Sequence, residues 1–175
     1  MSTDSPVLTR PSKEHIPQIA DFREEFAGCL DWLHGARGLR YIADPAEWLA
    51  YSARLEAGLD GAPPYTQFLF VRPSDGRIVG MLGIQHAPDG PVESWGGHIG
   101  YCVRPSERRK GYASAMLREA LPYCRSLGLS RVLLTAGDEN TGSVRTIIKN
   151  GGVFEGYYVS PKHGREIGRY WIELE

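Results

Sequence analysis

The stretch from His98 to Ala113 constrains the fold more strongly than any other part of the chain. Its first half, up to Arg104, is rich in β-branched and aromatic residues and ends at a proline, which predicts a strand that stops there. Its second half is basic, contains Gly111 and opens an amphipathic pattern, which predicts a helix to about Leu127. The first N–H groups of a helix have no internal partner and carry partial positive charge, so this order predicts an anion site.

The basic residues of the turn support this interpretation. Arg108, Arg109 and Lys110 stand where the helix begins, and cations at that end are unfavourable unless an anion neutralises them. Gly111 allows the backbone to approach a bulky anion closely. The turn matches neither the P-loop nor the dinucleotide-binding glycine pattern. A solvated basic loop before a helix is the alternative interpretation.

Hydrophobic periodicity and turn residues predict the remaining elements. The expected order is a strand at 6–9, a helix at 13–27, a helix at 45–57 capped by Asp44, strands at 66–72 and 77–86, a strand at 98–104, a helix to about 127, a strand at 131–136, a helix at 140–150 capped by Asn140, and strands at 153–160 and 168–174. The sequence thus predicts one α/β (α+β) domain over residues 1–175. Its central sheet is expected to be mixed, mostly antiparallel and flanked by helices.

Composition argues against several classes of function. A net charge of -1 and a pI near 6.5 give no overall attraction to nucleic acid or to an anionic membrane. The three cysteines, Cys29, Cys102 and Cys124, show neither a disulfide framework nor the spacing of a metal site. No signal-peptide pattern or bilayer-length apolar run is present. We therefore expect a cytoplasmic protein with no metal and with no membrane or nucleic-acid partner.

The pattern Arg108-x-x-Gly111-x-Ala113 resembles the acetyl-CoA pyrophosphate loop of the GCN5-related N-acetyltransferase (GNAT) superfamily. The predicted order of elements is also similar to the acyl-CoA N-acyltransferase fold of that superfamily. Within it, the stretch Gly97 to Ala113 resembles an uncharacterised bacterial branch of predicted acetyltransferases. The stretches 138–143, 149–152 and 169–172 extend this similarity toward the C-terminus.

The resemblance implies a site for acetyl-CoA. The residues that would hold its pyrophosphate, chiefly through backbone N–H groups, are Arg108, Arg109, Lys110, Gly111, Tyr112 and Ala113. Backbone groups of Tyr101, Cys102 and Val103 would pair with the pantetheine arm like an added strand, unless this is a plain central strand. Asn140 and Ser143 would lie near the pantetheine and phosphates, although a helix N-cap alone explains Asn140.

The acid–base residues are less clearly indicated. Relatives often place a glutamate where this chain has His98, and a tyrosine in the last helix where it has Ile147 or Ile148. His98 has a suitable pKa for a base at neutral pH, but a structural histidine fits the same position. Tyr101 is a second catalytic candidate, and Glu93, His86 and Tyr170 are unranked substitutes. Cys102 suits a small buried residue better than a nucleophile.

These observations predict an acetyl-CoA-dependent N-acyltransferase. We expect a primary amine, on a small molecule or a peptide, to attack directly in a ternary complex. A non-catalytic CoA-binding or sensing module is the alternative, favoured mildly by the missing tyrosine. A nucleic-acid-binding surface at Arg104, Arg108, Arg109 and Lys110 is disfavoured by the near-neutral charge. The last two strands are a possible homodimer edge, and the acceptor amine is not readable from the sequence.

Overall fold

The computed structural model describes residues 4–29, 33–58, 61, 63–86, 97–159, 164 and 166–174. The element order agrees with the predicted one throughout. The candidate Glu93 and most of the expected turn at 161–165 lie outside the described residues. Within the described ranges, no helix is long and apolar enough to cross a membrane.

The first sheet has four antiparallel strands in the order β1-β2-β3-β4. The strands are β1 (Val7–Thr9), β2 (Tyr65–Arg72), β3 (Arg77–Gln85) and β4 (Ile99–Val103). The predicted hairpin between β2 and β3 is confirmed, and Gly76 occupies the left-handed region, with φ of 65°, in its turn. This geometry brings the ends of β2 and β3 close to the segment that follows β4.

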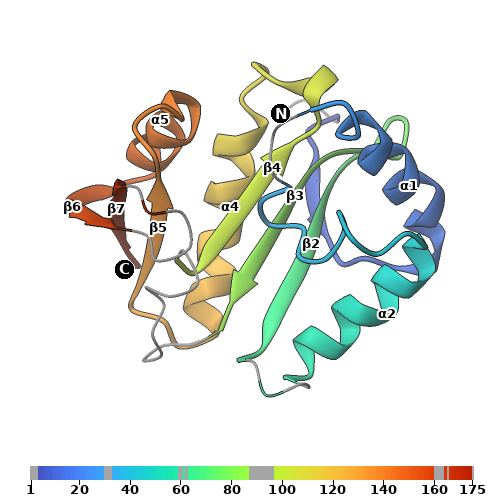
Figure 1. The fold of residues 1–175 in the computed structure, drawn as a ribbon, viewed down its shortest axis with the longest axis horizontal. Helices are drawn as coiled ribbons and strands as arrows, with labels where there is room; N and C mark the ends of the chain where they lie inside the picture. The colour runs from blue at the N-terminus through green and yellow to red at the C-terminus, as the bar shows by residue number, and fades with distance from the viewer. Residues whose placement is uncertain are drawn as a thin grey trace.

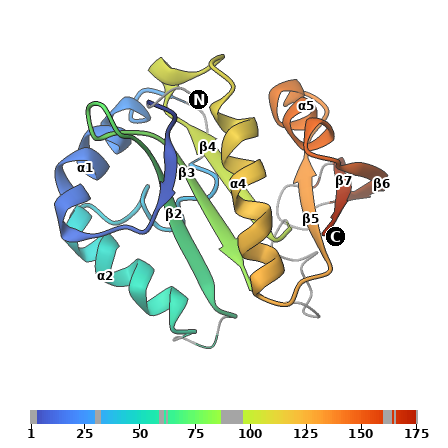
Figure 2. The ribbon, with the colours of Figure 1, turned by 180° about the vertical axis from the view of Figure 1, so that it is seen from behind.

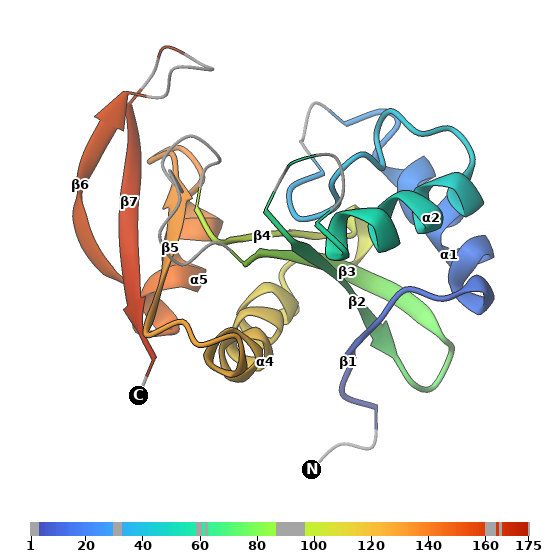
Figure 3. The ribbon, with the colours of Figure 1, turned by 90° about the horizontal axis from the view of Figure 1, so that it is seen from below.

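Helices cover both faces of this sheet (Figure 3). After a 3₁₀ turn (Lys13–His15), α1 (Ile16–Glu25) packs with α2 (Pro45–Glu56) on one face, and α4 (Tyr112–Ser126) packs on the opposite face. Successive side chains of β2 point to opposite faces of the sheet, so that Leu69 packs with α1 and α2 while Phe70 packs with α4. The predicted Asp44 cap is confirmed, since its carboxylate accepts the N–H of Ala46 at 2.8 Å.

The second sheet has three antiparallel strands in the order β5-β7-β6. It consists of β5 (Arg131–Ala136), β7 (Glu166–Glu173) and β6 (Val153–Val159), and α5 (Thr141–Lys149) follows β5. The outermost strand, β6, exposes several apolar side chains, including Val153 and Val159. The predicted homodimer at these last strands stays a prediction.

The two sheets meet at one end and then diverge (Figure 1). In the described part of the chain, the only bridge between them joins Gly97 to Leu134, while β4 pairs with β3 and β5 pairs with β7. Helix α4 lies behind the divergence and contributes to a core shared by both sheets (Figure 2). The fold class is confirmed, and the expected central sheet is divided into two parts between β4 and β5.

Candidate cofactor and active site

The edge of β4 that faces β5 pairs with no other strand of the described residues. Gln85 donates its N–H to the carbonyl of His98 at 2.8 Å, and Arg104 donates to the carbonyl of Val79 at 2.9 Å. In an antiparallel pair such contacts recur at every second residue, so the backbone of Cys102 also faces β3. The N–H and C=O groups of Tyr101 and Val103 therefore point toward the divergence, where an extended ligand can add as a strand.

The turn after β4 leads to the N-terminus of α4. Gly111 is the N-cap residue with φ of 83°, and no side chain in the described part of the chain caps this helix. Ala115 donates to the carbonyl of Gly111 at 3.1 Å, so the first intrahelical bond closes there. The preceding N–H groups of Tyr112, Ala113 and Ser114 are the orphan donors expected at a helix start. They form the predicted anion-binding end.

The three basic side chains of the turn are exposed but lie differently. The ammonium group of Lys110 contacts the buried carboxylate of Glu107 at 2.7 Å. Arg108 donates from Nε to the carbonyl of Val103 at 3.3 Å, which ties the turn to the open edge of β4. Arg109 has the left-handed backbone conformation, with φ of 66°. The sequence suggests one shared role for these cations, whereas the structure gives Lys110 an anionic partner within the protein.

The start of α5 lies beside the same divergence, where the side chain of Tyr101 on β4 contacts it. Its hydroxyl lies 2.9 Å from Oγ of Ser143, and burial raises the pKa of Tyr101 to about 12 despite hydrogen bonds to Ser143 and Thr146. Asn140 accepts the N–H of Ser143 at 3.1 Å, which confirms the predicted cap. Tyr101, Asn140 and Ser143, all predicted site residues, are thus brought together.

His98 lies where the two sheets meet. Its side chain is buried, its Nδ1 accepts the N–H of Leu133 at 2.9 Å, and its own N–H donates to the carbonyl of Leu133 at 2.7 Å. Because Nδ1 accepts, the neutral ring carries its proton on Nε2. This is the geometry of the structural histidine that the sequence left open, and a role for His98 as a base stays a prediction.

Of the other candidates, Cys102 and Tyr170 are buried and His86 is half-buried. Cys102 is 8% exposed, and burial raises the pKa of its thiol to about 12, so it is not a thiolate at neutral pH. Tyr170 is buried in the core shared by the two sheets. His86 contacts Oγ1 of Thr66 at 2.6 Å, and burial lowers its pKa.

The part played by Glu107 was not predicted from the sequence. This residue was not among the predicted site residues, although it precedes Lys110 by three positions. An opposite-charge pair at that spacing was the available signal. The partners from β2 and β3 described below are distant in the sequence and gave no local signal.

Comparison with known proteins agrees with this geometry. The model of the acetyltransferase (GNAT) family matches residues 20–151. No curated protein matches the chain significantly. Among solved structures, RimL, a ribosomal-protein alpha-N-acetyltransferase in complex with coenzyme A, superposes with a TM-score of 0.73 at 16% identity, covering 99% of this chain and 96% of its own.

Two further structures extend the comparison. RimJ of Mycobacterium smegmatis, in complex with a CoA disulfide, has a TM-score of 0.72 at 22% identity and covers 95% of this chain and 80% of its own. A chimera of the Vibrio cholerae spermidine N-acetyltransferase SpeG has a TM-score of 0.66 at 17% identity, with coverages of 97% and 96%. These likenesses support the fold. Because the family model spans well over half of the chain, the protein belongs to the acetyltransferase (GNAT) family and is an N-acetyltransferase.

Proposed function

We propose that the protein transfers the acetyl group of acetyl-CoA to a primary amine, which attacks the thioester directly while both substrates are bound. One observation carries the proposal: the open edge of β4 leads, through a 3₁₀ turn and the basic turn, to the N-terminus of α4, which no side chain of the described residues caps. An extended pantetheine arm suits the first feature and a pyrophosphate suits the second. Both features belong to a single strand–turn–helix segment.

The cofactor contacts follow from this arrangement. Tyr101 and Val103 would pair with the pantetheine amides, whereas the backbone of Cys102 is used by β3. The N–H groups that follow Gly111 would bind the pyrophosphate, and Arg108 and Arg109 would add charge. Acetyl-CoA supplies the chemistry in the form of an activated acyl thioester.

The residues of the chain then stabilise the negative charge that develops in the reaction and transfer protons. A backbone N–H of Tyr101 or Val103 would donate to the oxygen that becomes negative when the amine attacks. Tyr101 keeps its phenolic proton at neutral pH because burial raises its pKa to about 12, so it can donate to the leaving thiolate. Water takes the ammonium proton in this scheme. His98 could accept it only if its ring gave up the hydrogen bond from Leu133, because Nδ1 accepts that bond and Nε2 carries the ring proton.

The acceptor is an amine of a peptide or of a small molecule. RimL is named as a ribosomal-protein acetyltransferase and SpeG as a spermidine acetyltransferase, so the same fold serves both classes. A panel that contains peptides with free N-termini and polyamines tests both. Mass spectrometry of the amine and release of the CoA thiol report the reaction.

The kinetic pattern tests direct attack. Initial rates at varied acetyl-CoA and amine should give intersecting double-reciprocal lines, because both substrates bind before reaction. Parallel lines would indicate an acyl-enzyme and contradict the proposal.

A non-catalytic CoA-binding module, the alternative raised by the sequence, runs against membership of the acetyltransferase family. It is favoured by Ile147, fully buried, and Ile148, exposed, at the α5 positions where an acid was sought. Binding of CoA without acetylation of any panel amine would favour this alternative. The hydroxyl of Tyr101, which reaches α5, argues for the enzyme.

A further inference from the structure

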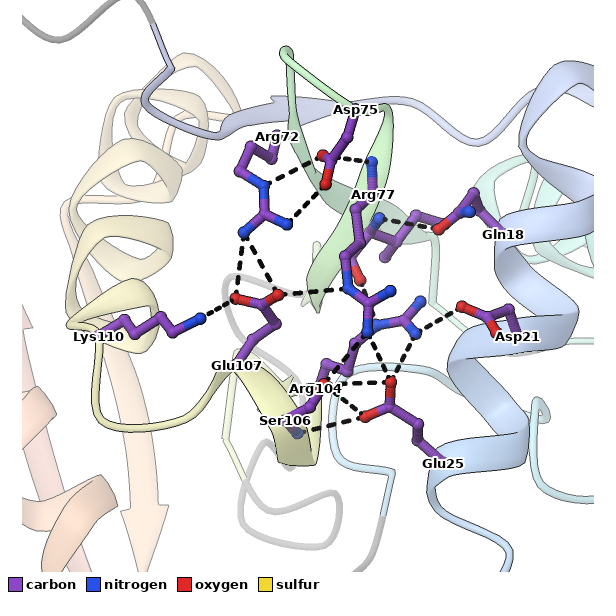
Figure 4. A network of polar contacts seen from close by, with 11 residues as sticks. Gln18, Asp21, Glu25, Arg72, Asp75, Arg77, Arg104, Ser106, Glu107 and Lys110 are labelled. Atoms are coloured by element: carbon purple, nitrogen blue, oxygen red, sulfur yellow. Dashed lines mark hydrogen bonds and ion pairs between the residues drawn. The ribbon is translucent and has the colours of Figure 1, made fainter.

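A network of charged side chains lies beneath the basic turn (Figure 4). It connects the C-terminal end of α1, the β2–β3 hairpin and the 3₁₀ turn Pro105–Glu107, which links β4 to the basic turn. Its members are Asp21, Glu25, Arg72, Asp75, Arg77, Arg104, Ser106, Glu107 and Lys110. Four carboxylates and four cations take part, so the network is neutral as a whole.

Glu107 is the point where this network meets the turn. Its carboxylate contacts Arg72 at 3.2 Å, Arg77 at 3.2 Å and Lys110 at 2.7 Å. Burial raises its pKa, but the hydrogen bonds from Lys110 and Arg72 outweigh this effect and the pKa is lowered overall. Glu107 is therefore ionised at neutral pH, and it holds Lys110 while it is itself held by two strands.

The outer members fix the partners of Glu107. Arg72 is engaged by Asp75 at 2.6 Å, and Arg77 is engaged by Glu25 at 2.8 Å. Glu25 also accepts from Arg104, which is fully buried, at 2.8 Å. Arg72 and Arg77 thus each contact a second carboxylate besides Glu107, and the carboxylate of Glu107 anchors Lys110 to them.

The turn needs such an anchor because its backbone is strained. Arg109 is the one non-glycine residue with positive φ in the described part of the chain. A left-handed conformation costs a residue with a side chain on the order of 1 kcal/mol and persists only where its surroundings impose it. Here the ion pair between Glu107 and Lys110 spans the strained residue, because Glu107 precedes Arg109 in the chain and Lys110 follows it.

We infer that Glu107 is a positioning residue for cofactor binding, which acts by holding Lys110 and thereby keeping the turn at Arg109 in its anion-binding shape. This inference rests on the proposed function. It assigns Lys110 a role in shaping the turn, in place of direct contact with the pyrophosphate.

Simple electrostatics makes the opposite prediction, and this makes the inference testable. Removing a negative charge beside an anion site, and releasing a cation, would strengthen CoA binding if charge alone mattered. Removing an anchor that shapes the site weakens binding. Whether Glu107→Gln strengthens or weakens CoA binding therefore distinguishes a purely electrostatic effect from an anchoring role.

The experiment is a calorimetric titration with CoA of the wild type, Glu107→Gln, Lys110→Met and the double variant. Each single change should raise Kd by about tenfold, the equivalent of roughly one strained backbone conformation. The double variant should bind as weakly as either single variant, because both act through one contact. Glu155→Gln, which removes a partner of Arg169 on the second sheet, is the matched control and should bind as the wild type does.

Two results of this titration would overturn the inference. Tighter binding by Glu107→Gln would show that its charge opposes the ligand. An equal loss from Glu107→Gln in the presence and absence of Lys110 would show that it acts only through Arg72 and Arg77. Failure of the wild type to bind CoA would instead overturn the proposed function, so the two failures are distinguishable.

A salt titration gives an independent readout should Glu107→Gln not fold. If Lys110 only shapes the turn, Lys110→Met should weaken CoA binding while the dependence of Kd on salt concentration stays that of the wild type. A flatter dependence would mean that Lys110 itself neutralises the ligand and would contradict the inference. Arg109→Met removes an exposed cation of the turn. This variant should flatten the dependence of Kd on salt concentration, and it shows how large the change is when a cation that neutralises the ligand is lost.

Discussion

The hydroxyl of Tyr101 on β4 lies 2.9 Å from Oγ of Ser143 on α5. This contact spans the divergence between the two sheets, because α5 follows β5 of the second sheet. It places a protonated phenol beside the opening where the thioester is proposed to lie.

Tyr101→Phe should lower kcat by about tenfold or more, since it removes the proposed proton donor. Kd for CoA should change little, because the backbone of β4 is unaltered. Tyr157→Phe, which removes an exposed hydroxyl bonded to Asp138 at 2.9 Å, is the matched control. An undiminished kcat in Tyr101→Phe would exclude the phenol as the acid.

The pH dependence gives a second test of Tyr101. A donor is active below its pKa, and burial raises the pKa of Tyr101 to about 12. The phenol should therefore impose no loss of kcat between about pH 7 and 10. A basic limb in that range that disappears in Tyr101→Phe would contradict the raised pKa, while it would still identify the phenol as the proton donor.

Cys102 should resist alkylation by iodoacetamide at neutral pH, because it is buried and its pKa is raised to about 12. Incubation with acetyl-CoA should leave its thiol unmodified in intact-protein mass spectrometry. Cys29, which is half-buried, serves as the internal comparison. An acetyl group found on Cys102 would support an acyl-enzyme intermediate and contradict direct attack by the amine.

Asn140→Ala should destabilise the protein by about 1 kcal/mol and also weaken CoA binding. Asp44→Ala removes an equivalent cap from α2. It should lower the free energy of unfolding by a similar amount and leave the affinity for CoA unchanged. Urea unfolding and calorimetry measure the two effects. If both variants bind CoA as the wild type does, Asn140 is a cap alone.

Acid should destabilise the fold through the charged network. Arg72 holds the pKa of Asp75 at about 2, below its ordinary 3.8, and the pKa of Glu107 is also lowered. Depressed carboxyl pKa values contribute stability that is present above the unfolded values and lost as pH falls through the folded ones. The free energy of unfolding should therefore fall between about pH 4.5 and 2.

Arg72→Met should flatten this decline, because Arg72 contacts both carboxylates. Arg10→Met removes an exposed ion pair with Glu56 and should leave the slope as it is. An unchanged slope in Arg72→Met would show that other groups govern acid unfolding.

The elements of the fold were predictable because their signals are local. A proline and a glycine bound the strand and turn between His98 and Gly111, and Asn140 and Asp44 cap helices that begin one residue later. Such signals act within a few residues and need no knowledge of the partner strands.

The division of the sheet and the role of Glu107 depend on distant contacts. The divergence arises because β5 pairs with β7, whose residues come more than thirty positions later. Glu107 meets Arg72 and Arg77 only because the β2–β3 hairpin and the 3₁₀ turn lie together in the folded chain. A single sequence carries no signal for such partners, which is why the cations of the turn were grouped as ligand contacts.

The central claim is that CoA lies along β4 with its pyrophosphate at the turn before α4. Calorimetric titration of CoA into the wild type, Gly111→Asp and Gly128→Asp tests it most directly. Both glycines have φ of 83°, a Cβ added at either one would meet open space, and they lie at opposite ends of α4. The account predicts binding by the wild type and by Gly128→Asp, and its loss in Gly111→Asp, where a carboxylate would face the pyrophosphate. Equal binding by all three proteins, or none by the wild type, would contradict it.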